Sequence, residues 1–148
     1  MNEEINELVQ FAITSKSPAN KKLELSIIET AEAKKLKIKT GLELNGYKRI
    51  IDKFGINHTL KEHGNEKTEK ARGQLPITNE DFELIPQIVK TENVIYSGLS
   101  KTGLDCILYE AIIDDVYFYV EEVRKGRKEL CIKTMYKRKP TTNKSSWF

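Results

Sequence analysis

The sequence predicts an α+β fold, with N-terminal helices followed by a four-stranded antiparallel meander sheet. Two observations indicate this order. Before Asn93, apolar residues recur at helical spacing, whereas after it they alternate with polar residues, as they do along strands. The segments between the predicted strands are also short enough for hairpins. Because the chain has 148 residues, we expect one domain, with or without an arm.

Helices are predicted in the first part of the chain. Residues 3–15 and 22–36 each carry apolar side chains one turn apart, and Pro18 separates them because the residue before a proline disfavours helix. A third helical stretch covers 46–63 and stops at Gly64. The first two stretches predict a helical hairpin or arm that packs on the domain or docks a partner.

The middle of the chain is expected to be irregular. Residues 65–74 are polar and charged, which predicts a mobile loop. Thr78 and Asp81 have the spacing of a capping box, and Pro86 predicts that the helix they begin is short or kinked. The four predicted strands cover 94–100, 105–113, 116–124 and 129–138.

These elements suggest three parts: a helical arm or extension over 1–45, a compact domain over 46–140 and a tail over 141–148. No apolar run approaches the roughly 18 residues that a membrane span needs. The acidic N-terminus lacks the basic start of a signal peptide, so we expect a cytoplasmic protein. Two cysteines within predicted strands are read as buried reduced thiols rather than a disulfide.

The net charge of +3 conceals a strong segregation along the chain. Residues 1–33 carry a net charge of −3, 34–72 carry +6, 73–122 carry −8 and 123–148 carry +8. If folding joins the two basic blocks, they form one positive surface suited to a polyanion. The alternative is two solvated lysine-rich faces without a partner.

The two histidines are the first candidates for chemistry. His58 and His63 are five residues apart, so they do not share a helix face as a metal-binding pair does. Two cysteines are too few for a zinc site, and we expect neither a metal nor a cofactor. His63, at a helix end beside a basic loop, is expected to be exposed and to act as a general acid or base. The alternative for His63 is a cap or surface residue, and His58 is expected to be structural.

Charged and hydroxyl side chains gather on the last two predicted strands. Alternation places Glu122 with Arg124 on one face, Thr134 with Tyr136 on a face of the last strand, and Lys133 on its other face with Met135 and Lys137. Arginine and lysine can stabilise the charge that develops in an in-line displacement at phosphorus. The register between the strands stays open, and an ordinary basic edge strand is the alternative.

Four segments in order resemble a known family: HTLKEHG, GQLPIT, DFELIPQIV and YVEEVRKGRKELCIKTMYKR. Over roughly 46–140 the chain resembles the phage-associated barnase–EndoU–colicin–RelE-like nuclease domains. The resemblance implies a curved antiparallel sheet with helices on one side. It also implies a metal-independent endoribonuclease that leaves a 2′,3′-cyclic phosphate, with RNA, such as tRNA, as partner and with a possible immunity or antitoxin protein.

The resemblance also implies site residues. The catalytic candidates are His63, Arg72, Glu122, Arg124, Thr134 and Tyr136. The two basic blocks supply the candidates for RNA binding, which are Lys61, Lys67, Lys70, Lys133, Lys137 and Arg138. A toxin is one form of such a nuclease. The alternatives are a nucleic-acid-binding module without catalysis and a phage structural or interaction protein.

Overall fold

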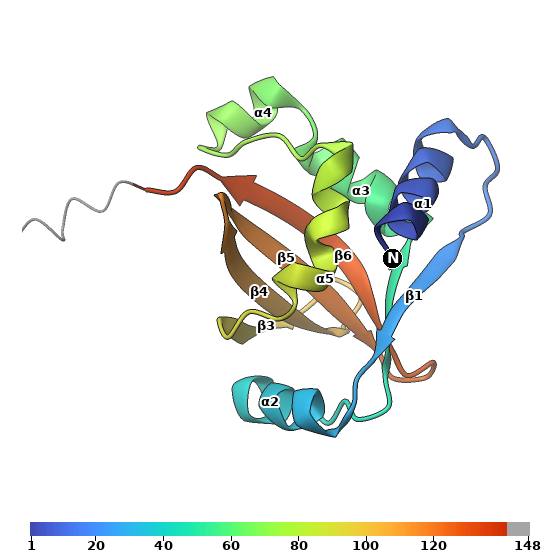
Figure 1. Cartoon of the computed structure of the whole chain (residues 1–148), viewed down its shortest axis with the longest axis vertical. Helices are drawn as coiled ribbons and strands as arrows, with labels where there is room; N and C mark the ends of the chain where they lie inside the picture. The colour runs from blue at the N-terminus through green and yellow to red at the C-terminus, as the bar shows by residue number, and fades with distance from the viewer. Residues whose placement is uncertain (142–148) are drawn as a thin grey trace, which may run out of the picture.

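The computed structural model describes residues 1–141, which form an α+β fold (Figure 1). The helices of this part are α1 (Asn2–Thr14), α2 (Thr30–Thr40), α3 (Lys53–His63), α4 (Glu66–Ala71), the 3-10 helix η1 (Asn79–Leu84) and α5 (Ile85–Ile88). Its strands are β1 (Lys22–Ile27), β2 (Lys48–Asp52), β3 (Val94–Leu99), β4 (Asp105–Ile113), β5 (Asp115–Arg124) and β6 (Glu129–Arg138). None of these helices is long and apolar enough to cross a membrane.

The strands form one mixed sheet in the order β1-β2-β6-β5-β4-β3. The predicted antiparallel meander is present as β3 to β6, with bounds close to those expected. The prediction of four strands is nevertheless wrong, because β2 pairs in parallel with β6, and β1 pairs antiparallel with β2. These pairings bring the first half of the chain into the same sheet as the second half.

The helix predicted over 22–36 is wrong, because residues 22–27 form β1 and a helix begins only at Thr30. The helix predicted over 46–63 is wrong in its first part, which forms β2. Asp52 then caps α3, its side chain accepting a hydrogen bond from the Gly55 backbone. Short apolar segments fit both the period of a helix and that of a strand. Here the pairing of β1 with β2 decides for the strand.

The loop predicted over 65–74 contains a helix. Asn65 caps α4 by accepting a hydrogen bond from the backbone N–H of Thr68. The capping box predicted at Thr78 is confirmed, and the Asp81 carboxylate accepts from the Thr78 backbone at 2.7 Å. Pro86 lies in the first turn of the four-residue helix α5, as expected for a short helix.

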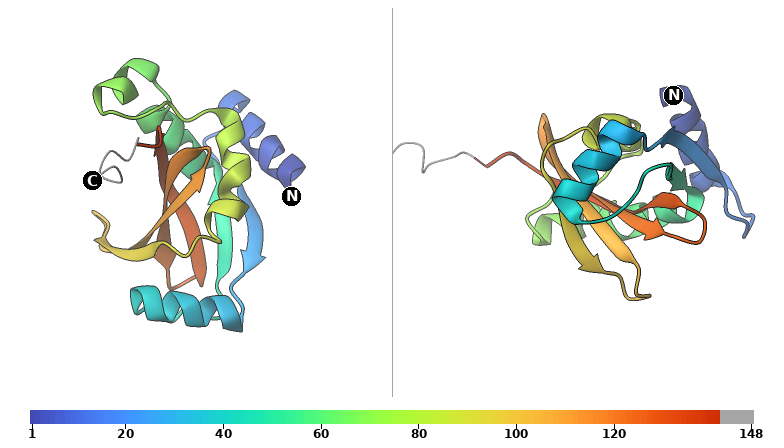
Figure 2. Two further views of the ribbon diagram at one scale, coloured as in Figure 1. Left: turned by 60° about the vertical axis from the view of Figure 1, so that its left-hand side comes forward. Right: turned by 90° about the horizontal axis from the view of Figure 1, so that it is seen from below.

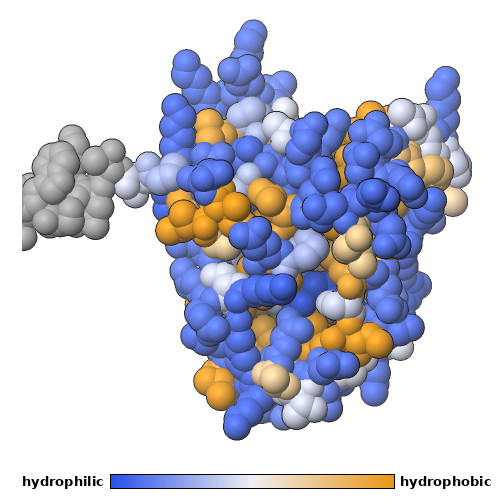
Figure 3. Space-filling model, in the orientation of Figure 1, coloured by the Kyte–Doolittle hydropathy of each residue, from blue (hydrophilic) through white to orange (hydrophobic). Residues whose placement is uncertain are grey.

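The sheet has an inner face that faces the core and an outer face. On β5, the inner residues Tyr117, Tyr119, Glu121 and Val123 are buried. The outer residues Phe118, Val120, Glu122 and Arg124 are partly exposed. Helices α1 and α5 and η1 complete the core with residues such as Ile5, Phe82 and Ile88. Figure 2 shows α5 on one side of β5 and β6, and α3 and α4 on the other. Figure 3 views the α5 side, which is largely hydrophilic with separate apolar patches.

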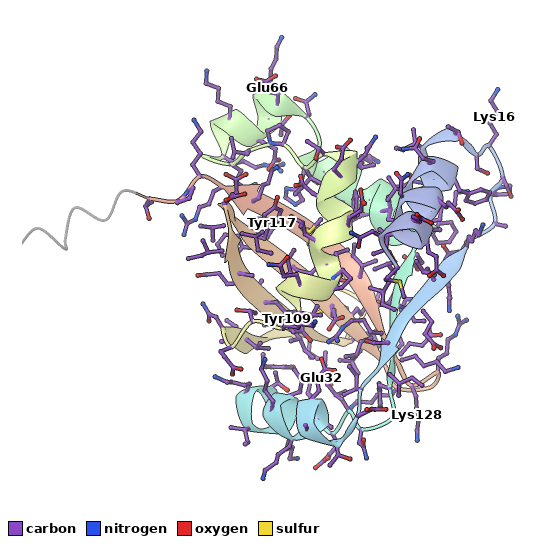
Figure 4. All side chains as sticks on the ribbon, in the orientation of Figure 1. Lys16, Glu32, Glu66, Tyr109, Tyr117 and Lys128 are labelled. Carbon is purple, nitrogen blue, oxygen red and sulfur yellow. The ribbon has the colours of Figure 1, made fainter. Side chains whose placement is uncertain are left out.

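A charged network lies inside the core. The Arg49 guanidinium from β2 is 2% exposed and donates to Glu121 at 2.6 Å and to Tyr109 at 3.0 Å. It also donates to Glu32 of α2 at 2.7 Å, and Figure 4 shows Tyr109 and Glu32 in the same region between the sheet and α2. Burial lowers the pKa of Arg49, but the combined interactions with Glu121, Tyr109 and Glu32 outweigh it, and the pKa lies well above its usual value.

Helix α3 lies unusually close to β6. A Cβ atom built on Gly55 would lie 2.5 Å from the Ile132 Cγ2 atom and 2.8 Å from the Ile132 carbonyl oxygen, so this position needs glycine. Because β2 pairs with β6 only as far as Cys131, the chain leaves the sheet there and α3 runs beside the rest of β6. Both histidines of α3 therefore lie beside β6.

Candidate active site

A cleft of about 180 Å³ opens on the outer face, where α3 meets β5 and β6. Three chain segments contribute charged or titratable side chains to it. Helix α3 provides His58, and its N-cap residue is Asp52. Strand β5 provides Glu122 and Arg124, and β6 provides Lys133. Phe54, Gly55 and Ile132 complete its lining. The cleft therefore combines a carboxylate pair, an imidazole and two cations.

Ion pairs connect the groups in the cleft. Glu122 is 12% exposed, and its carboxylate lies 3.4 Å from the Arg124 Nε atom and 3.7 Å from the Lys133 ammonium. The Asp52 Oδ2 atom lies 3.8 Å from Arg124 and accepts a hydrogen bond from Asn20, and its Oδ1 atom accepts one from the Gly55 backbone in the first turn of α3. Asp52 is thereby held as a structural carboxylate, whereas Glu122 contacts only flexible cationic side chains.

A β-bulge decides which lysine reaches the cleft. Val120 pairs with Thr134 and Glu121 with Ile132, so Lys133 is the extra residue of β6. The predicted common face for Lys133 and Lys137 is therefore wrong. Lys133 contacts Glu122, whereas Lys137 is 8% exposed on the inner face, with its ammonium 2.9 Å from Asp81. Lys137 is thus already neutralised by a carboxylate.

His63 is held by a buried carboxylate. Its Nδ1 atom lies 3.2 Å from Glu69 of α4, a residue with no exposed surface. Arg72 donates to the same carboxylate at 2.9 Å and to the Glu62 carbonyl at 2.8 Å. The expectation of an exposed His63 is wrong, since the side chain is 16% exposed, and it is His58 that is exposed. A carboxylate that orients an imidazole is a common device in proton-transferring sites.

A row of planar groups crosses the outer face beside His63. The His63 ring centroid lies 5.3 Å from that of Tyr136, and Tyr136 stacks on Phe118 at 4.9 Å and 11°. The Arg138 guanidinium lies over Phe118 at 5.5 Å. Burial and then repulsion from Glu110 raise the pKa of Tyr136, so its hydroxyl stays a proton donor at neutral pH.

Thr134 lies between this row and the cleft. Its hydroxyl is buried and has no hydrogen-bond partner within residues 1–141. That this hydroxyl donates to a phosphate oxygen stays a prediction. The catalytic candidates thus form two neighbouring groups on one face. Glu122 and Arg124 lie in the cleft, and His63, Arg72 and Tyr136 lie around Glu69 or in the aromatic row.

The candidate RNA-binding lysines differ in position. Lys61, Lys67 and Lys70 are exposed on α3 and α4. Lys70 lines a pocket of about 430 Å³ together with Arg138 and Lys139 from the end of β6. The two basic blocks of the sequence therefore meet at this pocket, close to the aromatic row.

Four residues of this region were not among the sequence candidates. They are Asp52, Glu69, Phe118 and His58. Glu69 lies in a charged run in which nothing marks it as buried, and Asp52 precedes a helix that was predicted to begin earlier. The i, i+2 alternation with Glu122 was a usable signal for Phe118. No group of three or more His, Cys, Asp or Glu residues in the described part of the chain is arranged to hold a metal ion.

Comparison with known proteins gives one match. Neither the curated proteins nor the solved structures contain a significant match to this chain. A family model described as phage-Barnase-EndoU-ColicinE5/D-RelE like nuclease 3 matches residues 26–145. That range includes the cleft, the His63–Glu69 pair and the aromatic row. The chain therefore belongs to this phage-associated family of nucleases.

Proposed function

We propose that this protein is a metal-independent endoribonuclease and that the cleft beside α3 is its catalytic centre. The observation that carries the proposal is the convergence of Glu122, His58, Arg124 and Lys133 on one small cavity. Cleavage of RNA by its own 2′-hydroxyl needs a proton acceptor, a proton donor and positive charge at the phosphate. The cleft supplies all three from protein side chains.

The reaction can be written with these groups. Glu122 accepts the proton of the 2′-hydroxyl, and the 2′-oxygen attacks the adjacent phosphorus. Protonated His58 donates its proton to the 5′-oxygen as the bond between phosphorus and that oxygen breaks. The products are a 2′,3′-cyclic phosphate and a 5′-hydroxyl. Arg124 and Lys133 stabilise the additional negative charge in the transition state.

The two cations of the cleft can exchange their contact with Glu122 for a contact with a bound phosphate. Arg124 and Lys133 lie at 3.4 Å and 3.7 Å from Glu122. Both cations are partly exposed, at 30% and 38%, so both can turn toward a phosphate. When they do, they leave the Glu122 carboxylate free to contact the 2′-hydroxyl. Phosphate binding therefore clears the way to the proton acceptor.

This assignment differs from the one predicted from sequence, in which His63 transfers the proton and His58 is structural. The rival still has support, since Glu69 orients His63. The two histidines form a natural matched pair for an experiment. The catalytic roles of Arg72, Thr134 and Tyr136 likewise stay predictions.

A short RNA oligonucleotide incubated with purified protein in EDTA tests the reaction, with the ends identified by mass spectrometry. We expect cyclic phosphate ends, and at least about 100-fold slower cleavage for Glu122→Gln and for His58→Ala. Loss confined to His63→Ala, with His58→Ala active and folded, would transfer the proton-donor role to His63. Ends bearing a 3′-hydroxyl, or a requirement for magnesium, would overturn the mechanism.

The substrate is expected to be tRNA or another cytoplasmic RNA, and an inhibitor protein would protect the producing cell. Expression of the wild-type chain in a bacterial host should then slow growth, and Glu122→Gln should relieve it. The competing function is nucleic-acid binding without catalysis on the same scaffold. It predicts RNA binding with no cleavage and equal growth for both chains.

A further inference from the structure

The outer face carries a feature that the proposed chemistry does not use. The cleft ends near Lys133, but polar and aromatic groups continue along β5 and β6 to Phe118, Tyr136 and Arg138. Phe118 lies four residues from Glu122 on the same strand and the same face. At about 3.3 Å per residue, the two side chains are about 13 Å apart. That spacing is at most about four nucleotides of a strand with stacked bases.

We infer that Phe118, with Arg138 above it and Glu110 beside it, is a subsite for one unpaired nucleobase of the RNA substrate. The inference rests on the proposed function and adds the class of substrate. A base held flat on an aromatic ring has left its own stack, so the recognised nucleotide must be unpaired. The protein would therefore cleave RNA near loops or single-stranded segments.

The geometry of the aromatic row indicates where the base would enter. Tyr136 stacks on Phe118 and also packs on His63. The Arg138 guanidinium, on a long and partly exposed side chain, lies over the Phe118 ring, 5.5 Å from its centroid. A base can enter between ring and guanidinium, because arginine stacks on bases as readily as on aromatic rings. The Tyr136–His63 contact then acts as a rigid backing for the ring.

Glu110 gives this subsite a means of selecting bases. It pairs directly with Phe118 across β4 and β5, which places the two Cβ atoms about 5 Å apart on the outer face. Its carboxylate makes no ion pair or hydrogen bond within residues 1–141, and the residue is partly exposed. A carboxylate accepts from amino groups at a base edge, as it does from the N4 amino group of cytosine. Cytosine should therefore be preferred over uracil, which has a carbonyl at that position.

An abasic residue placed at successive positions of the substrate tests the stacking step. The substrate is a DNA oligonucleotide with a single ribonucleotide, so that cleavage by a 2′-hydroxyl is possible at one linkage only. An abasic residue is placed at each position up to four on either side. We expect one position at which base removal slows cleavage by about 5- to 150-fold, the range for one base stacked on an aromatic side chain. Phe118→Leu should remove this dependence, and Phe118→Tyr should keep it.

Base choice is tested at the sensitive position with cytosine and uracil, which differ at the edge facing Glu110. Wild type should cleave the cytosine substrate faster, and Glu110→Gln should remove the difference. Ile38→Ala, an exposed residue of α2 at 74% exposure, is the matched control and should change neither result. A Phe118→Leu protein that slows all substrates equally, the abasic ones included, would give Phe118 a structural role and overturn the subsite.

The two proposals fail in different ways. If the wild-type protein does not cleave the ribonucleotide linkage, the proposed function is wrong. If it cleaves all abasic substrates at the same rate, the nuclease stands and the base subsite is wrong, which would leave the aromatic row free for a protein partner. If an abasic position matters but Phe118→Leu does not change its effect, the base is recognised elsewhere and the assignment to Phe118 fails.

Discussion

At the scale of single residues, the most consequential contact is the buried ion pair of Arg49 with Glu121. Both side chains are essentially without exposure, at 2% and 0%. Such a pair contributes little net stability, because taking two charges out of water costs about as much as their attraction returns. Loss of one partner has a much larger effect, since the other charge stays buried.

Replacing Arg49 with methionine should therefore lower the free energy of unfolding by about 3–5 kcal/mol. Urea denaturation followed by circular dichroism measures the change. Lys48→Ala, the neighbouring residue, removes an exposed pair with Glu24 and should cost at most about 1 kcal/mol. A double variant with Arg49→Met and Glu121→Leu should recover part of the loss. Equal, small effects of both single variants would show that water reaches Glu121.

At the scale of elements, the approach of α3 to β6 positions the proposed chemistry. At Gly55 the backbone of α3 packs directly on Ile132 of β6, and His58 lies one turn further along the helix at the cleft. The position of that histidine relative to Glu122 therefore depends on a glycine. Stability and activity should be coupled there.

We expect Gly55→Ala to destabilise the protein by about 1–3 kcal/mol, because the new methyl group would overlap Ile132 and push α3 away. RNA cleavage should fall even at temperatures where the protein is fully folded. Gly126→Ala is the matched control, since nothing lies within 4 Å of its added Cβ atom and its backbone is unstrained. A stable Gly55→Ala protein with full activity would contradict this account of the helix.

At the scale of the whole molecule, folding sorts the basic residues into groups with different surroundings. The block 34–72 is divided between α2 at one end of the sheet and α3 and α4 at the other (Figure 1). The α4 end joins the block 123–148 through the pocket of Lys70 and Lys139. A polyanion on the outer face should therefore contact the α4 end and not α2.

Salt dependence of RNA binding tests this division. Using Glu122→Gln to prevent cleavage, replacement of Lys70 and Lys139 by alanine should reduce the slope of log affinity against log salt by about 1.4, at about 0.7 per lost phosphate contact on a single strand. Lys34 and Lys39, exposed on α2 and from the same basic block, form the control pair and should leave the slope unchanged. Equal effects of the two pairs would mean that charge acts without regard to position.

The structure also changes an expectation for Lys137. From the sequence, it is one of the candidates for RNA binding. Its ammonium is instead bound to Asp81 on the inner face. Replacing Lys137 should lower the free energy of unfolding and leave RNA binding unchanged.

The sequence by itself determined the second half of the fold. Strict alternation and short turns define β3 to β6, because the period of a half-buried strand is set locally by the pleat. It also determined the charge segregation, the end of α3 at Gly64 and the family. The strand and helix-end signals come from residues close together in the chain, and the charge blocks and the family match need only the order of residues along it.

Tertiary structure alone decided the first half of the sheet and the composition of the site. Leu23 and Ile27 fit a helix or a strand, and pairing with β2 placed them in β1. A bulge at Lys133 turned that lysine to Glu122, and burial of Glu69 tied down His63, the histidine expected to be free. Each outcome depends on a partner that is distant in sequence, and a local pattern carries no information about distant partners.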